Sequence, residues 1–216
     1  MAQCDRDLPR LSTKRSPAPL ALLVAAALAA ACGSETRALL PPGTSELQKA
    51  AASDDTSLLE NAPGEALFAR GSYGWTLLHF AAIYDAPRAA ELLLRRGAQA
   101  NAIDNTGMTP LHWASRRGNA EVAAVLLEGK AEVMARNQFD MTPLHEARSV
   151  EVARLLLDHG ADLHARDIDG MTPLHTAPTK RVSDLYIQRG ASLVARARDG
   201  RSPMDMPPVP KPHLEE

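Results

Sequence analysis

The sequence predicts an all-α repeat solenoid of helix-turn-helix units, and three observations lead to this fold class. A four-residue motif recurs along the chain, as Thr76–His79, Thr109–His112, Thr142–His145 and Thr172–His175, with a remnant at Ser202–Met204. The spacings between these motifs are 33, 33, 30 and 30 residues. An apolar triplet follows each motif, at 92–94, 125–127, 155–157 and 185–187. Because a unit of this size cannot bury its own apolar surface, neighbouring units must stack.

The motif predicts the start of the first helix in each unit. A threonine at the N-cap accepts a backbone N–H, and a proline at the first helical position already has the helical φ and has no donor to leave unsatisfied. Small residues follow in each unit and allow helices to approach closely, namely Ala81, Ala114, Ala147 and Ala177.

The apolar triplet predicts the buried face of a second helix. Gly97, Gly160 and Gly190 come just after it, where a helix ends in the left-handed conformation. The chain then turns outward into a finger such as 165–170. Each unit is therefore expected to contain two helices and a finger.

The Thr-Pro-Leu-His motif at this period resembles the ankyrin repeat family, and the resemblance covers about three quarters of the chain. It implies a stack of helix pairs with β-hairpin-like fingers. We expect an ankyrin domain over 46–206, divided into an N-terminal cap (46–73), four repeats (74–106, 107–139, 140–169 and 170–199) and a C-terminal cap (200–206). A Pro-rich tail follows at 207–216.

Repeats three and four depart from the pattern, because each lacks three residues between the motif histidine and the apolar triplet. The first helix or its turn must therefore be shorter there. Pro178 is expected to remove a hydrogen bond from the first helix of repeat four. Lys130 and Asp140 stand where glycine is usual and are expected to adopt the left-handed conformation. The C-terminal half is thus expected to be the less stable one.

The N-terminus reads as a targeting signal. Four basic residues precede an apolar run of twelve, Leu20–Ala31, which is too short to span a bilayer and suits a secretory signal. The run ends at Ala29-Ala30-Ala31-Cys32, which resembles the lipobox of bacterial lipoproteins. The resemblance implies a signal peptide over 1–31, a lipidated Cys32, a tether over 32–45, and anchoring at the outer membrane or location in the periplasm. Simple secretion, an uncleaved anchor and a chance apolar run are the alternatives.

Composition excludes several classes of function. The net charge is −2, and without residues 1–31 the balance is 20 basic against 24 acidic residues, so we expect no nucleic-acid partner. The only cysteines are Cys4 and Cys32, both before the repeats. The motif histidines recur about 10 Å apart along a stack, too far to share one metal ion. We expect them to bond the motif threonine and backbone instead. No catalytic constellation is present, so we expect neither an enzyme nor a cofactor.

What remains for function is the surface. Ankyrin domains, by resemblance, bind partners with the finger tips and the exposed face of the first helices. Aromatic and arginine side chains at those positions suit a protein partner with an acidic patch. The residues expected to bind it are Phe80, Tyr84, Trp113, Arg116, Arg117, Arg136, Phe139, Arg166, Ile168 and Arg196.

The sequence thus predicts a monomeric, non-enzymatic scaffold for protein–protein interaction, held at a bacterial membrane by Cys32. The alternatives are a structural spacer or a toxin-immunity protein of the cell envelope, and a cytosolic ankyrin adaptor. At each candidate position the competing interpretation is packing between repeats, for Trp113 and Phe80, or an ordinary solvated face, for the arginines.

Overall fold

The computed structural model describes residues 45–205, except for the side chain of Ser72, and all of them belong to one compact unit. Within that range the chain forms helices and turns, with no β-strand. The helices are α2 (Glu46–Ala52), α3 (Thr56–Asn61), α4 (Gly64–Leu67), α5 (Leu77–Tyr84), α6 (Pro87–Arg95), α7 (Pro110–Arg117), α8 (Ala120–Glu128), α9 (Val150–Asp158) and α10 (Lys180–Gln188). Two 3₁₀ turns, η2 (Ser72–Gly74) and η3 (Pro203–Asp205), complete the secondary structure of this range.

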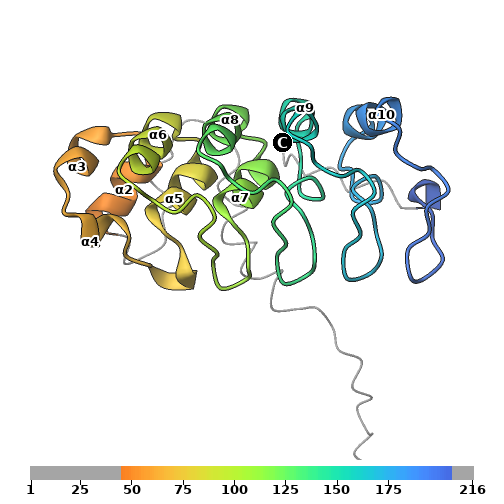
Figure 1. Cartoon of the computed structure of the whole chain (residues 1–216), viewed down its shortest axis with the longest axis horizontal. Helices are drawn as coiled ribbons and strands as arrows, with labels where there is room; N and C mark the ends of the chain where they lie inside the picture. Colours follow the sequence, from red (N-terminus) through yellow and green to blue (C-terminus); the bar gives the residue numbers. More distant parts are fainter. Residues whose placement is uncertain (1–44, 206–216) are drawn as a thin grey trace, which may run out of the picture. The chain divides into compact units, whose positions relative to one another are not determined.

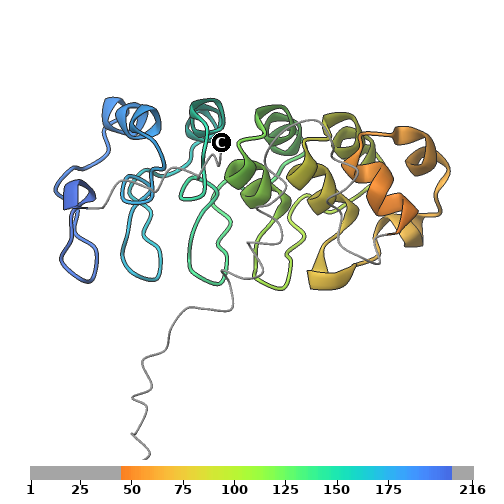
Figure 2. The same ribbon diagram turned by 180° about the vertical axis from the view of Figure 1, so that it is seen from behind.

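The helices pack in two rows. An outer row runs through α3, α6, α8, α9 and α10, each against the next, and an inner row runs through α2, α5 and α7. The inner and outer helices of one repeat also pack together, as α5 with α6 and α7 with α8 (Figure 1; Figure 2 gives the view from behind). This is the stacked helix-turn-helix arrangement that the motif spacing predicts.

The helix ends form where the sequence places its capping residues. Thr109 is the N-cap of α7, its side chain accepts a hydrogen bond from the backbone N–H of His112, and Pro110 occupies the first helical position. Gly118 ends α7 with φ at +79°, a left-handed conformation that glycine adopts without strain. At the front of the stack, Ser45 and Gln48 form a reciprocal capping box on α2.

The inner row stops after α7, which is the main consequence of the three-residue deletions. In repeats three and four the motif forms a single turn, over 143–146 and 173–176, instead of a helix. The expectation for Pro178 was therefore wrong in its mechanism: Pro178 lies in the connection before α10, where there is no helix for it to break. Lys130 (φ +64°) and Asp140 (φ +56°) are left-handed, as expected.

Side chains of repeat four replace the hydrogen bonds that a full inner helix in repeat three would have made. The Tyr186 hydroxyl, on α10, donates to the Leu144 carbonyl at 3.0 Å, and the Thr176 hydroxyl donates to the His145 carbonyl at 2.8 Å. Tyr186 is fully buried at a position that holds leucine in the other three repeats. Its larger ring occupies the interior beside the shortened turn.

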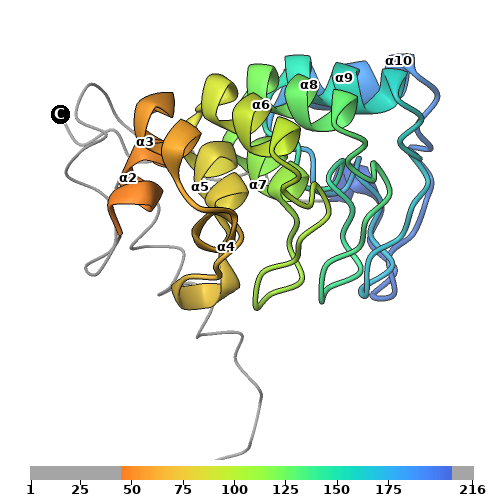
Figure 3. The ribbon, with the colours of Figure 1, turned by 60° about the vertical axis from the view of Figure 1, so that its left-hand side comes forward.

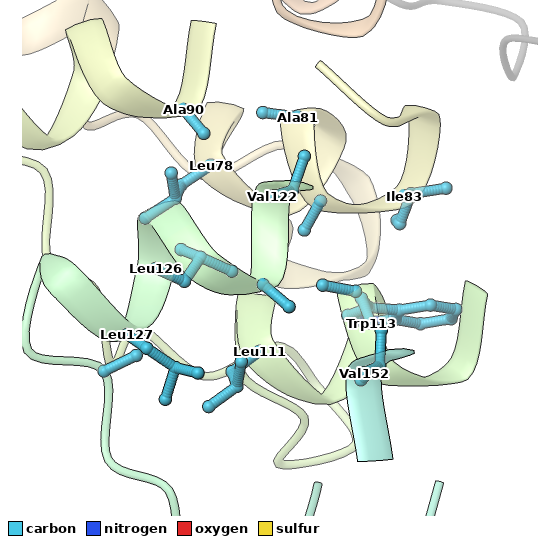
Figure 4. Packing of buried hydrophobic residues seen from close by; sticks show 14 of the residues in the cluster. Leu78, Ala81, Ile83, Ala90, Leu111, Trp113, Val122, Leu126, Leu127 and Val152 are labelled. Carbon is cyan, nitrogen blue, oxygen red and sulfur yellow. The ribbon is translucent and has the colours of Figure 1, made fainter. Parts of the chain in front are cut away.

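One continuous hydrophobic core runs between the two rows. Figure 4 shows Leu111 of α7 and Leu126 of α8 within this core, and both have no exposed surface. The core thins at the C-terminal end of the described residues: Met204 is 74% exposed, whereas Leu144, at the same position of repeat three, is 1% exposed. The expected weakness of the C-terminal half thus has a visible structural basis.

The fingers are turns that project from the same side of each repeat (Figure 3). Each is closed by a backbone hydrogen bond, such as Asp104 N–H to Met108 O at 2.9 Å. One backbone hydrogen bond also joins each finger to the next, for example from Ile168 N–H to Phe139 O at 3.0 Å. The fingers are therefore hairpin-like turns held at a regular spacing, but their residues do not form strands.

Candidate protein-binding surface

The four motif histidines are structural groups that join each repeat to the next. In every motif Nδ1 accepts the backbone N–H of the threonine, at 3.0–3.2 Å, and lies 2.9 Å from the threonine hydroxyl. Nε2 lies 3.0–3.3 Å from a carbonyl of the following repeat. Since Nδ1 accepts, the proton is on Nε2 and the imidazole is neutral. The expected bonding to threonine and backbone is confirmed.

Burial lowers the pKa of His79, His112 and His145. It lowers the pKa of His79 and that of His112 to about 4, although the carbonyl acceptor and the nearby Asp104 act in the opposite direction. The pKa of His145 is also lowered by burial. The cause is that the folded protein has no room to solvate an imidazolium, and that a second proton on Nδ1 would face an N–H donor.

Asp104 gathers both tryptophans of the chain around one carboxylate. Its Oδ2 accepts the indole N–H of Trp113 at 2.9 Å and that of Trp75 at 3.2 Å, and its Oδ1 accepts three further bonds from Thr106 and Met108. Burial alone would raise the pKa of Asp104, but the hydrogen bonds from Thr106, Trp113 and Met108 outweigh it and lower the pKa. The side chain therefore stays an anion that fixes the first two fingers.

This cluster changes the role of two residues expected to meet a partner. Trp113 is only 9% exposed, and its ring meets Trp75 edge to face with centroids 5.4 Å apart. Phe80 is 3% exposed and packs against Trp75 and Tyr84. The anchor expected at Trp113 is thus not presented on the surface, and both side chains pack between repeats.

Arg136, Arg166 and Arg196 stand at the same position of three successive fingers and form a column, and these arginines also have a structural role. Arg136 Nη1 donates to the Asp140 carbonyl of its own finger at 2.9 Å and to the Arg166 carbonyl of the next finger at 2.8 Å. Arg166 repeats the arrangement with Gly170 and Arg196. All three side chains remain exposed. Arg136 and Arg166 hold neighbouring fingers together, whereas Arg196 donates to the Gly200 carbonyl of its own finger. Sequence reasoning missed Arg70, which occupies the same column and donates to the Ile103 carbonyl.

The finger tips carry a series of exposed apolar side chains. Four successive fingers each present one, with exposed fractions between 38% and 51%: Tyr73, Ile103, Phe139 and Ile168. Phe139 and Ile168 lie on the surface, where a partner would meet them. Tyr73 was assigned to the N-terminal cap, although its position three residues before a motif threonine marks it as a finger residue.

The inner face, which is the exposed side of the inner-row helices, carries a second group of the residues predicted to bind a partner. Tyr84 is half-buried at the end of α5, and Arg116 and Arg117 are the last residues of α7. Arg116 lies over the Trp113 ring, 5.8 Å from its centroid, and pairs with Glu146 at 3.6 Å. This face is therefore aromatic and basic, and its one acidic side chain named here, Glu146, is paired with Arg116.

Within residues 45–205, no group of three or more His, Cys, Asp or Glu side chains is placed to hold a metal ion. None of the helices in that range has the length and apolar character needed to cross a membrane. Cys32, the expected lipidation site, lies outside the described residues.

The two rows of helices, the finger ladder and the exposed tips define a repeat solenoid built to present a surface. The family described as ankyrin repeats in three copies matches residues 29–137, just over half of the chain. A second family, described as ankyrin repeats in many copies, matches residues 144–177. The chain belongs to the ankyrin repeat family. No curated protein matches it significantly.

Ankyrin repeats are generally non-catalytic modules that bind other proteins. The matched ranges include the exposed tips Tyr73, Ile103 and Ile168, and Phe139 lies between them.

Proposed function

We propose that the chain is a non-enzymatic scaffold that binds a partner protein through its finger tips and inner face. One observation carries the proposal: four successive fingers each present a large exposed apolar side chain, and backbone hydrogen bonds hold these fingers in register. Apolar side chains carried by fingers that are already held in place lose little entropy on binding and suit the centre of an interface. They cost solubility in a free protein, so their repetition favours a binding role.

The test is capture of a partner by the full chain carrying an affinity tag, with identification by mass spectrometry. The double variant Phe139→Asp/Ile168→Asp places charges on two neighbouring tips. Loss of two apolar contacts of this kind is expected to weaken binding at least tenfold. Ile187→Asp is the matched control, because Ile187 is 39% exposed on the outer helix α10, against 38% for Phe139. Equal loss in the control would contradict the assignment to the fingers.

We further propose that Cys32 carries lipid and holds the scaffold at a bacterial membrane. The support is the apolar run that ends at this cysteine. Several acyl chains would make the attachment permanent, since each buried methylene contributes about 0.8 kcal/mol. Cys32→Ser is therefore expected to move the protein from the membrane fraction to the soluble fraction and to abolish labelling with palmitate. A wild-type protein that is already soluble would refute the anchor and favour an adaptor that is not attached to a membrane.

A further inference from the structure

Three arginines are close together on the inner face because repeat three is short. Arg116 and Arg117 end α7, and the chain of repeat three turns back at once after its single-turn motif. The backbone N–H of Arg148 donates to the Ser115 carbonyl at 3.1 Å, and the Ser149 hydroxyl donates to the Gly118 carbonyl. The shortened repeat therefore places Arg148 directly against the C-terminal end of α7.

The electrostatic surroundings support treating these three residues as one group. Burial lowers the pKa of the Arg117 guanidinium, and the charges of Arg116 and Arg148 lower it further, whereas Tyr84 opposes them. Arg116 pairs with Glu146, and both side chains are largely buried. The Arg148 side chain is exposed and makes no ion pair with any other residue in 45–205. Like charges held this close repel one another, so an incoming anion would relieve the repulsion.

We propose that Arg116, Arg117 and Arg148 form a docking site for a short acidic segment of the partner protein. This inference rests on the proposed function and names the chemistry that its inner face recognises. Guanidinium groups bind carboxylates through paired hydrogen bonds, and Tyr84 beside them offers a half-buried aromatic surface.

The charge of the whole protein favours an acidic peptide over a nucleic acid. The chain has 26 acidic against 24 basic residues, so a long polyanion would meet repulsion beyond the three arginines. A short segment would contact the arginine group alone. The ligand is thus expected to carry a few carboxylates and to depend moderately on salt.

The experiment measures fluorescence anisotropy of a labelled hexaglutamate peptide with the full chain at about 20 mM and 150 mM salt. Arg117→Gln/Arg148→Gln is expected to weaken binding at least tenfold. The single variant Arg148→Gln, at an exposed position, is expected to weaken it at least threefold, which keeps the test decisive if the double variant folds poorly. Arg154→Gln/Arg181→Gln removes two exposed arginines from the outer helices α9 and α10 and is expected to change affinity less than twofold.

Equal affinity of wild type and Arg148→Gln would overturn the proposal, as would binding of single-stranded DNA as tight as that of hexaglutamate. The partner-capture assay separates this inference from the proposed function. If Arg117→Gln/Arg148→Gln still captures the partner at full strength while the finger variant does not, the arginine site is wrong and the scaffold stands. If no variant affects capture, both are wrong.

Discussion

Acid is expected to destabilise the repeats well above the range in which carboxylates titrate. His79 and His112 are neutral in the folded protein, each with a pKa of about 4, against 6.5 in an unfolded chain. Because the folded pKa is the lower one, the unfolded state binds protons first as the pH falls. Stability is therefore unaffected by these groups well above pH 6.5, decreases between about 6.5 and 4, and decreases no further below 4.

The size of the effect follows from the same two values. At pH 5 the imidazole is almost fully protonated in the unfolded chain and almost fully neutral in the folded protein. This difference lowers the free energy of unfolding by about 2 kcal/mol per histidine. His79 and His112 together are expected to lower the free energy of unfolding by about 4 kcal/mol between pH 7.5 and pH 5. That is a large part of the stability of a typical domain. Because the pKa of Asp104 is lowered, protonation of this carboxylate affects the free energy of unfolding only in more acid solution.

The assay is urea unfolding at pH 7.5 and pH 5, at constant ionic strength, followed by tryptophan fluorescence. Trp113 follows His112 in the chain and packs against Trp75, four residues before His79, so the two rings report on the first two repeats. His112→Gln removes one titrating group. The free energy of unfolding that this variant loses between pH 7.5 and pH 5 is therefore expected to be about 2 kcal/mol. His159→Gln, which removes an exposed histidine, is the control. A wild-type loss below about 1 kcal/mol, or an unchanged loss in His112→Gln, would refute the reasoning.

Three further predictions concern stability. Tyr186→Phe leaves the Leu144 carbonyl without its hydroxyl donor and is expected to cost about 1–2 kcal/mol in chemical unfolding, whereas Tyr73→Phe at an exposed tip costs nothing measurable. Hydrogen exchange is expected to show weaker protection after about Arg148, because the inner row of helices ends before it; uniform protection would contradict this. Trp113→Ala is expected to lose about 3–5 kcal/mol of folding free energy, since the ring is buried. Near-normal stability of this variant would contradict the packing of Trp113 between repeats.

The sequence was sufficient for the fold because the repeat signals are local. A threonine and a proline specify a helix start, a glycine specifies its end, and the period specifies the stacking. The left-handed positions of Lys130 and Asp140 could be predicted for the same reason. The single turns in repeats three and four could be predicted only as some shortening, because whether three missing residues shorten a helix or remove it depends on packing from α10.

The candidate surface was harder to predict, since a residue type does not reveal which way its side chain points. Trp113 and Ile168 both follow the repeat pattern, yet a carboxylate 2.9 Å away holds the indole of Trp113 inward, whereas Ile168 stays 44% exposed. The finger arginines show the same limit, because clamping depends on backbone carbonyls that have no signature in the sequence. What the pattern did predict was the set of positions from which surface residues are drawn.

The bond from each motif histidine to the next repeat has a consequence for how such chains change over time. From His79 and His112 the acceptor lies 29 residues ahead, but from His145 and His175 it lies 26 residues ahead, with nearly the same distance between the atoms. The three missing residues lie between the motif histidine and the apolar triplet, in the part of the chain that leaves the contact between two repeats and later returns to it. The length of the inner helix can therefore drift, by selection or by design, without altering the register in which the units stack. The contour offered to other molecules and the register of the stack are thus separately adjustable.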